Sequence, residues 1–283
     1  MADVEIVEVG PRDGLQNEAR IIPTAKKIAL IDTLAAAGFR RIEVASFVSP
    51  RWVPQMADCA EVLAQVHGLG PRLMALVPNL KGFDAAMAAR TDVIAVVTAA
   101  SEGFARANLN ASVAESLDRL RPVLEAARRI AIPVRGYVST VTDCPYDGPT
   151  PPGSVARIAA ALRDMGCEEI ALGETLGRAM PESIDAMLRA VLEELPPDRL
   201  AGHFHDTAGR ALDNVDAAFD RGLRIFDASI AGLGGCPFAP GAAGNVVTES
   251  LHDHLTARGH RTGLDRAALL RATDLARSLR DPP

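Results

Sequence analysis

Short runs of apolar and β-branched residues alternate with longer runs rich in alanine and leucine along almost the whole chain. The short runs are typical of buried strands, and the longer runs have the apolar periodicity of helices. We expect eight strands, at residues 4–9, 41–46, 72–77, 92–98, 133–140, 168–174, 199–205 and 225–230. We expect eight helices between and after them, at residues 24–37, 56–67, 81–89, 112–130, 153–165, 181–195, 208–221 and 245–255.

This alternation predicts parallel strands joined by right-handed crossovers. Eight such units favour a closed (β/α)8 TIM barrel over an open sheet, because the turn after the first strand, GPRDGLQNE, lacks the G-x-G-x-x-G pattern. A further helix, at residues 265–279, should pack outside the barrel. Since no linker rich in proline, glycine or serine divides the chain, we expect residues 1–283 to form a single α/β domain. Its barrel would span about 4–255 and its C-terminal helical extension about 260–280.

Composition narrows the class of protein. The 283 residues are 48% hydrophobic, which is enough for a full core and excludes a disordered or fibrous chain. With 30 Lys and Arg against 36 Asp and Glu, the net charge of −6 gives no bulk attraction to nucleic acid or to an anionic membrane. There is no apolar run of about 20 residues and no recognisable targeting segment. We therefore expect a cytoplasmic protein with reduced cysteines, a small-molecule substrate, and no nucleic-acid or membrane partner.

Two histidines stand at the end of the seventh expected strand, in GHFHD. In a TIM barrel the chemistry takes place at the C-terminal ends of the strands, so residues there are the first candidates. His203 and His205 are two positions apart and should point to the same side of the strand. Two converging imidazoles form half of a metal site, and the alternative is a pair of satisfied polar residues inside the barrel. Their shared position at one strand end favours metal binding.

Charged residues follow or lie within the first two strands. Asp13, in GPRDG, would face the barrel mouth as a further ligand, although an aspartate before glycine is usually a turn or cap residue. Arg12 is either a surface charge or, if it points inward, a planar donor for a carbonyl or enolate oxygen. Glu43 needs a partner if it is buried. Arg12 could be that partner, in a catalytic role or in a structural ion pair.

The segment CPFAPGAAG, residues 236–244, follows the eighth strand. Its glycines and prolines predict an irregular, mobile loop over the barrel mouth. Asn245 ends this loop and is either an oxygen ligand for Mg²⁺ or Mn²⁺ or the N-cap of the next helix. Cys236 is either an acid, base or nucleophile or an incidental loop thiol. Glu174, at the end of the sixth strand, could orient a ligand histidine.

One aspartate, two histidines and an asparagine would form a mixed nitrogen and oxygen site that suits a divalent cation with open positions for substrate and water. An arginine beside such a cation suits chemistry that proceeds through an enolate. An all-thiolate zinc site is excluded, because none of the four cysteines lies in a C-x-x-C pair.

Eight stretches, taken together, resemble a known family: VEVGPRDGLQNE, EVASFVSPRWVPQM, PNLKGFDAA, RGYVST, CPYDG, LGET, GHFHDTAG and AGLGGCPFAPGAAGN, in this order. The chain resembles the 3-hydroxy-3-methylglutaryl-CoA lyases of the DRE-TIM metallolyases, from about residue 4 to residue 255. The resemblance implies a metal-dependent TIM-barrel lyase that cleaves 3-hydroxy-3-methylglutaryl-CoA to acetyl-CoA and acetoacetate. It also implies Mg²⁺ or Mn²⁺ as cofactor, an acyl-CoA substrate, and a homodimer or higher homo-oligomer.

The resemblance also implies roles for individual residues. The metal ligands would be Asp13, His203, His205 and Asn245. The residues expected to act in the reaction are Arg12 on the enolate oxygen, Glu43 holding Arg12, His203 as base, and Cys236 as the active-site thiol. Glu174 and Asp206 would support the ligands, and Arg12, Gln16 and Ser46 would contact the substrate.

Two positions depart from the family pattern. The family usually has L-G-D-T where this chain has LGET, so Glu174 carries a longer arm, and it usually has a tyrosine at the position of Ala208. These changes leave a second acyl group open, a longer 3-alkyl branch such as isohexenyl. Phe204, between the two histidines, should point away from the metal. A catalytically inactive barrel used as a binding protein is the remaining alternative, and the intact set of candidate residues argues against it.

Overall fold

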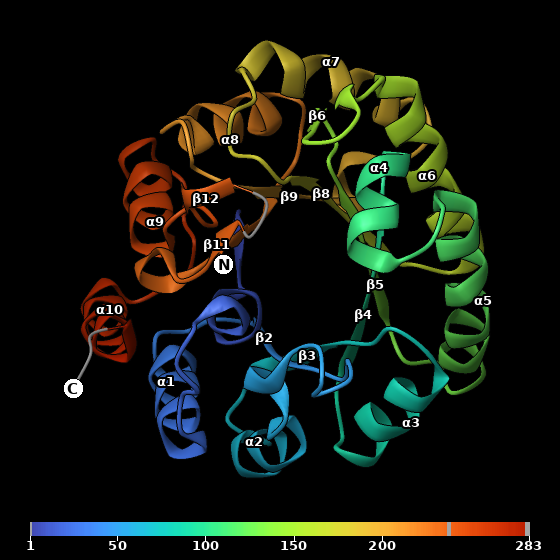
Figure 1. Cartoon of the computed structure of the whole chain (residues 1–283). Helices are drawn as coiled ribbons and strands as arrows, with labels where there is room; N and C mark the ends of the chain where they lie inside the picture. Colours follow the sequence, from blue (N-terminus) through green and yellow to red (C-terminus); the bar gives the residue numbers. More distant parts are fainter. Residues whose placement is uncertain (1, 237–238, 281–283) are drawn as a thin grey trace.

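The computed structural model describes residues 2–236 and 239–280, with the backbone alone at residues 235–236 and 239–243. Its centre is a closed barrel of parallel strands in the order β1, β10, β9, β8, β5, β4, β3, β2 (Figure 1). The barrel strands are β1 (Glu5–Glu8), β2 (Arg41–Ser46), β3 (Arg72–Leu76), β4 (Val93–Ala99), β5 (Val134–Ser139), β8 (Glu169–Glu174), β9 (Leu200–Phe204) and β10 (Ile225–Ala228). The expected TIM barrel is therefore confirmed.

A ring of helices surrounds the barrel (Figure 1). The helices are α1 (Thr24–Ala36), α2 (Cys59–Val66), α3 (Leu80–Ala88), α5 (Val113–Arg129), α6 (Pro152–Met165), α7 (Pro181–Leu192), α8 (Ala211–Asp220) and α9 (Thr248–Ala257). The expected C-terminal helix is α10 (Arg266–Arg280), which packs on the outside against α1 and α9. Within residues 2–236 and 239–280, no helix has the length and apolar content needed to cross a membrane.

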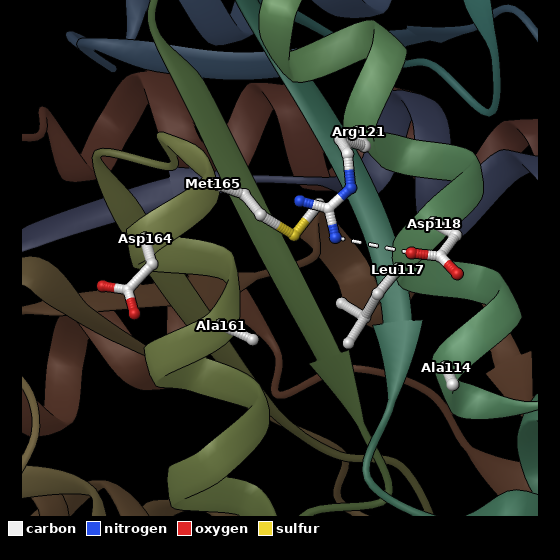
Figure 2. Close-up of a pocket in the computed structure, with 7 residues that line it drawn as sticks. All are labelled: Ala114, Leu117, Asp118, Arg121, Ala161, Asp164 and Met165. Atoms are coloured by element: carbon white, nitrogen blue, oxygen red, sulfur yellow. Dashed lines mark hydrogen bonds and ion pairs between the residues drawn. The ribbon is translucent and has the colours of Figure 1, made fainter.

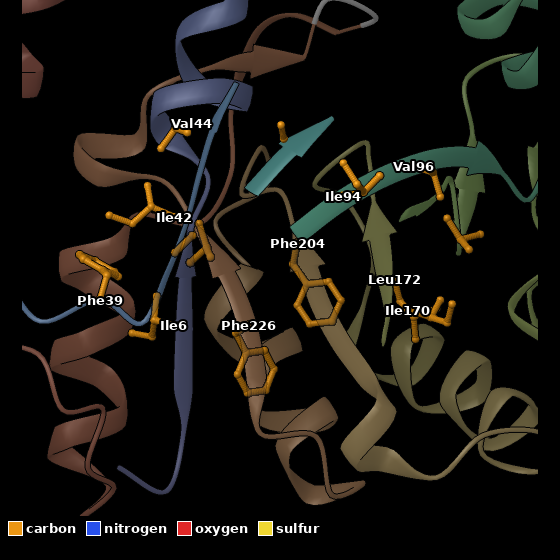
Figure 3. Close-up of a cluster of buried hydrophobic side chains, with 14 of the residues drawn as sticks. Ile6, Phe39, Ile42, Val44, Ile94, Val96, Ile170, Leu172, Phe204 and Phe226 are labelled. Carbon is orange, nitrogen blue, oxygen red and sulfur yellow. The ribbon is translucent and has the colours of Figure 1, made fainter. Parts of the chain in front are cut away.

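Alternation along the strands separates two layers of side chains. The outward-facing residues, such as Ile42, Val44 and Phe226, fill the apolar layer between barrel and helices (Figure 3). Phe204 belongs to this layer, so it points outward from the barrel interior, as its place between two inward-facing histidines predicts. Inward positions include charged side chains, among them the fully buried Glu43. The barrel interior is therefore the place to look for paired charges.

Local sequence explains where the helices begin. The helix α5 starts at a capping box, in which Oγ of Ser112 accepts the backbone NH of Glu115 and the Glu115 carboxylate accepts the NH of Ser112. The helix α8 starts three residues later than its expected beginning at residue 208. Residues 206–209 form a turn instead, because Oδ1 of Asp206 accepts the NH of Ala211 at 2.8 Å and Gly209 has a positive φ of 68°.

The glycine- and proline-rich segment after β10, expected to be irregular, contains paired strands among its described residues. Gly235–Cys236 (β11) and Ala239–Ala243 (β12) form a small antiparallel sheet. A two-stranded sheet consists only of edges, so a strand that contains proline can still pair. A second such sheet, β6 (Asp143–Cys144) with β7 (Gly148–Pro149), also escaped prediction, because such short strands have no hydrophobic period.

Short helical turns complete the chain. Two are π-helical, η1 (Gly10–Gly14) and η4 (Ala105–Leu109), and α4 (Glu102–Phe104) precedes the second of them. The 3-10 turns are η2 (Leu15–Asn17), η3 (Pro54–Met56), η5 (Pro197–Arg199) and η6 (Ile230–Gly232). Of these turns, η1 matters most for the site, because it follows β1 directly and carries the GPRDG motif.

Candidate active site

The turn η1 places two charged residues at the C-terminal end of β1. The carbonyl of Val9 accepts the backbone NH groups of Arg12, Asp13 and Gly14 at 3.2, 2.8 and 3.3 Å, so the chain turns sharply as the strand ends. A Cβ atom on Gly14 would lie 2.7 Å from Cβ of Leu233, which explains why glycine closes the turn. Arg12 and Asp13 are thereby presented together at the barrel mouth.

Asp13, from the turn after β1, converges there with His203 and His205, from the end of β9 and the residue after it. Each offers one ligand atom, and the three atoms lie within 4.8 Å of one another. Nε2 of His203 is 4.0 Å from Oδ2 of Asp13. Asn245 joins them, because its Nδ2 donates to Oδ2 of Asp13 at 2.7 Å and its backbone bridges to His205. The four residues expected to bind metal are therefore neighbours, although they come from distant parts of the sequence.

The donor set fits a divalent cation. Nδ1 of His205 and Oδ1 of Asn245 are buried and have no hydrogen-bond partner among the described residues. Burial, with a contribution from His203, lowers the pKa of His205 to about 4, so its imidazole is neutral near pH 7. Burial tends to raise the pKa of Asp13, but Arg12 and the two histidines outweigh it and lower that pKa to about 2. Neutral imidazole, carboxylate and amide oxygen together suit Mg²⁺ or Mn²⁺.

Arg12 points into the barrel and is 5% exposed, so it is not a surface charge. Its Nη2 donates to Oε2 of Glu43 at 2.6 Å and its Nη1 donates to Oδ1 of Asp13 at 2.6 Å. Burial tends to lower the pKa of Arg12, but the two carboxylates outweigh it and raise that pKa above its usual value. Nε of Arg12 has no hydrogen-bond partner within the described part of the chain, and each Nη has a second N–H that these two bonds do not use, so donors remain for a substrate oxygen.

Sequence reasoning missed three buried polar residues that extend this ion pair. Oε2 of Glu43 also accepts the hydroxyl of Tyr137 at 3.1 Å, and Nη1 of Arg135 donates to the same hydroxyl at 3.0 Å. Nη2 of Arg135 then donates to Oδ1 of Asp227 at 2.7 Å. Oδ2 of Asp227 lies 2.9 Å from Nδ1 of His203. A continuous path of hydrogen bonds therefore crosses the barrel interior.

A signal for these residues was present in the sequence. Arg135 in PVRGYVS and Asp227 in IFDAS are charged residues within apolar strand patterns, as Glu43 is. A buried charge needs a partner, and the argument that paired Glu43 with Arg12 applies equally to Arg135 and Asp227. Arg135 and Asp227 are each no more than 1% exposed, and their pairing gives each buried charge the partner it needs.

The supporting residues expected from the sequence make other contacts. Oε1 of Glu174 accepts the NH of Arg178 at 3.4 Å, and neither histidine is among its hydrogen-bond partners in residues 2–236 and 239–280. Burial raises the pKa of Glu174 to about 7, although backbone NH groups of residues 176–179 favour its ionised form. Asp206 caps α8 rather than a ligand, and Ala208 is exposed in the turn before it. The carboxylate beside His203 is that of Asp227, whose Oδ2 lies 2.9 Å from Nδ1 of the ring.

The other residues expected to contact the substrate or act on it differ in how near they lie to the cluster around Asp13. Nε2 of Gln16 is 3.5 Å from Oδ1 of Asp13, so Gln16 lies beside the cluster. Ser46 ends β2, is 1% exposed, and its Oγ has no hydrogen-bond partner among the described residues. The side chain of Cys236 lies outside the described part of the structure, and its expected role as the active-site thiol stays a prediction.

Glu8, at the end of β1, joins three segments around the site and was not predicted. Its Oε1 accepts the NH of Gly10 at 2.8 Å and of Ile230 at 2.9 Å, and its Oε2 accepts the hydroxyl of Thr248 at 2.7 Å. These donors belong to the start of η1, to η6 and to the start of α9. Glu8 is fully buried, and burial raises its pKa to about 8. Its carboxyl group ties together the turn that carries Asp13 and the helix that follows Asn245.

Glu8→Ala should lower the free energy of unfolding by roughly 3 kcal/mol or more, because it leaves three buried donors without an acceptor. Urea unfolding followed by circular dichroism measures this change. Glu125→Ala, at an exposed position of α5, is the matched control and should stay within about 0.5 kcal/mol of the parent chain. Equal midpoints for the two variants would contradict the tethering role of Glu8.

The depressed pKa of His205 predicts a pH dependence for the metal-free chain. The unfolded chain takes up a proton on His205 near its ordinary pKa of 6.5, whereas the folded chain does so only near 4. Stability contributed by the neutral imidazole is therefore full above pH 6.5 and is lost as the pH falls toward 4. The loss should be about 3 kcal/mol.

The measurement is the free energy of unfolding of the parent chain and of His205→Gln, each from pH 7.5 to pH 4 in buffer that contains a chelator. Subtraction of the two profiles removes the effects of other titrating groups. The difference should shrink as the pH falls, because glutamine does not titrate. Parallel profiles would show that His205 is not held neutral by burial.

A pocket also lies outside the barrel, between α5 and α6 (Figure 2). It is lined by Ala114, Leu117, Asp118, Arg121, Ala161, Asp164 and Met165. None of these residues belongs to the cluster at the barrel mouth. The candidate active site is therefore the cluster around Asp13.

Comparison with known proteins agrees with this geometry. The family model described as HMGL-like matches residues 3–276. The chain is 52% identical over 270 residues to the 3-hydroxy-3-isohexenylglutaryl-CoA/hydroxy-methylglutaryl-CoA lyase of Pseudomonas aeruginosa, covering 95% of this chain and 90% of that protein. It is 50% identical over 270 residues to the hydroxymethylglutaryl-CoA lyase of Pseudomonas mevalonii, with the same coverage.

Solved structures give the same result. The HMG-CoA lyase from Brucella melitensis superposes with a TM-score of 0.97 at 53% sequence identity, covering 99% of both chains. An HMG-CoA lyase from Acinetobacter baumannii, solved in complex with coenzyme A and 3-methylmalate, superposes with a TM-score of 0.92 at 37% identity, covering 98% of this chain and 91% of that one. From the family match over residues 3–276 and from identities of 50% or more to full-length relatives, the chain belongs to the HMGL-like family.

Proposed function

We propose that the chain is a metal-dependent carbon–carbon lyase that cleaves 3-hydroxy-3-methylglutaryl-CoA to acetyl-CoA and acetoacetate. The observation that carries this proposal is the convergence of Asp13, His203, His205 and Asn245 beside the buried Arg12. A metal site next to a fixed guanidinium suits a reaction that develops negative charge on two different oxygens of one substrate. The names of the relatives support the same substrate.

We assign the cation to Asp13, His203, His205 and Asn245, and Mg²⁺ and Mn²⁺ both match these ligands. When bound, such a cation would supply Lewis acidity toward the tertiary hydroxyl of the substrate. Nδ1 of His203 faces Asp227, so Nε2 is the one nitrogen that His203 can offer. Nε2 would contact the cation in the substrate-free protein and accept the hydroxyl proton of the bound substrate.

Loss of the hydroxyl proton allows the bond between C2 and C3 of the substrate to break. The electron pair of the new C=O bond comes from the hydroxyl oxygen, which makes acetoacetate, and the electrons of the broken bond form the acetyl-CoA enolate. Arg12 would hold the enolate oxygen, with Glu43 and Asp13 fixing its guanidinium from two sides. Cys236 would donate its thiol proton to the enolate carbon, and the proton taken up by His203 would then pass through water to the Cys236 thiolate, so that both residues return to their starting states.

We further propose that the chain works in the cytoplasm as a single catalytic domain, in a homodimer or higher homo-oligomer. The acyl-CoA substrate is supported by the coenzyme A complex of the relative from Acinetobacter baumannii. Relatives carry both cytoplasmic and mitochondrial names, and bacterial ones carry neither.

The methyl branch is favoured over a longer one, because the relatives share the hydroxymethylglutaryl name and the isohexenyl name occurs beside it in one of them. The test is a panel of 3-hydroxyglutaryl thioesters with methyl, propyl and isohexenyl branches, scored for release of acetyl-CoA. The methyl compound should give the highest kcat/KM. A higher value for the isohexenyl compound would reassign the acyl group, and no release from any compound would overturn the proposed function.

A further inference from the structure

The path of buried hydrogen bonds that ends at His203 contains the ion pair of Arg135 and Asp227. The proposed reaction does not use this ion pair. Asp227 lies on β10 and Arg135 on β5, and the two are joined by a hydrogen bond of 2.7 Å in the barrel interior. Arg135 has a second carboxylate partner, because its Nε lies 2.6 Å from Oε1 of Glu169. Several contacts therefore fix the position of the Asp227 carboxylate, and a rigid carboxylate is what orients a neighbouring group.

Asp227 uses its other oxygen on His203. Oδ2 of Asp227 lies 2.9 Å from Nδ1 of His203, while Nε2 of the same ring lies 4.0 Å from Oδ2 of Asp13. The two nitrogens of the imidazole therefore face opposite carboxylates, one inside the barrel and one at its mouth. A carboxylate can only accept a hydrogen bond, so the proton of a neutral His203 must be on Nδ1. Nε2 is then left with its lone pair directed toward the mouth.

Tyr137 restricts the same ring from the side. The rings of Tyr137 and His203 meet edge to face, with centroids 5.6 Å apart and an angle of 75° between their planes. The hydroxyl of Tyr137 is held by Arg135 and Glu43, so this contact is itself fixed. Rotation of the His203 ring would break the hydrogen bond to Asp227 and disturb this packing.

We propose that Asp227, held by Arg135, is a positioning residue that fixes the tautomer and ring orientation of His203, so that Nε2 is presented to the cation and the substrate. This inference rests on the proposed function, since it concerns the same site. Removing a carboxylate that orients a ligand histidine typically weakens metal binding by about 10- to 100-fold.

The first test is the affinity of the purified apo-protein for Mn²⁺ alone, measured by electron paramagnetic resonance of the free ion, which needs no turnover. Asp227→Asn keeps the volume of the side chain and should weaken Mn²⁺ binding by about tenfold or more. The control is Asp58→Asn, which likewise removes the charge from an ion pair, here a partly buried one in which Oδ1 of Asp58 lies 2.6 Å from Nζ of Lys27. The control should bind Mn²⁺ within about twofold of the parent chain. Equal affinities of the two variants would overturn the proposal.

The second test uses the unaltered chain and so does not depend on how the variant folds. Nitrogen-15 spectra of histidine-labelled apo-protein at about pH 8, with His203→Gln for assignment, report which ring nitrogen carries the proton. We expect the Nδ1-protonated form for His203, and the Nε2-protonated form would overturn the proposal. If the parent chain released no acetyl-CoA but gave the expected tautomer and affinities, the proposed function would fail while the positioning role stood.

Discussion

Replacing Arg12 by glutamine should lower kcat by about 10³-fold or more, with little change in metal affinity. Arg12 is buried and held by Glu43 and Asp13 at 2.6 Å each, and its Nε is left without a partner among the described residues. A guanidinium fixed in this way is already in place when the enolate charge develops, which is the condition for strong stabilisation of a transition state. Glutamine keeps some volume but cannot supply the charge.

The measurement is acetyl-CoA release at saturating substrate, combined with Mn²⁺ affinity of the same preparation. Arg41→Gln is the matched control, because Arg41 begins β2 and pairs with Glu5 and Glu169 at the other end of the barrel. The control should keep its turnover within about threefold, as expected for a change remote from the reacting atoms. Normal turnover of Arg12→Gln would show that the enolate assignment is wrong.

Asp13→Ala should weaken metal binding by more than about 100-fold and reduce turnover to background. Asp13 is central to the cluster, since its carboxylate lies near His203 and His205 and accepts hydrogen bonds from Arg12 and Asn245. Its pKa of about 2 means that it is ionised throughout the working pH range. Alanine removes the only negative ligand of the set and leaves Nδ2 of Asn245 without its acceptor.

Metal content after dialysis against a known Mg²⁺ concentration checks this prediction, and acetyl-CoA release gives the second readout. Asp185→Ala is the control, because Asp185 pairs with Arg189 and Arg221 on the outer helices and should change neither value. Metal content equal to that of the parent chain would place the cation elsewhere and would contradict the whole ligand assignment.

Most of the fold was predictable because strands and helices differ in hydrophobic period, and their strict alternation admits few topologies. The errors are local and have physical causes. Residues 208–210 were expected to be helical, but Gly209 has a positive φ and the NH of Ala211 donates to Oδ1 of Asp206, so α8 starts at Ala211. The strands β11 and β12 are held together by backbone pairing. A segment of glycine, alanine and proline has no alternation of apolar and polar residues that would predict such strands.

The residues at the ends of the strands could be predicted as a site, whereas the contacts among the residues inside the barrel could not. His203, His205 and Asp13 stand at strand ends, where position alone makes them candidates. Arg135, Tyr137 and Asp227 sit inside the barrel, and which of them meet depends on the order and stagger of strands around it. The side chains of Glu174 and Asp206 accept hydrogen bonds from nearby backbone NH groups. Several donors lie close to each carboxyl group along the chain, so the sequence does not indicate which one is bound.

The most direct measurement is the fate of 3-hydroxy-3-methylglutaryl-CoA incubated with the purified chain, first stripped with a chelator and then supplied with Mg²⁺. The account predicts no cleavage after stripping, and after Mg²⁺ addition acetyl-CoA and acetoacetate in equal amounts. Unchanged cleavage in the stripped chain would contradict metal dependence. Intact thioester in the presence of Mg²⁺ and Mn²⁺ would contradict the lyase itself.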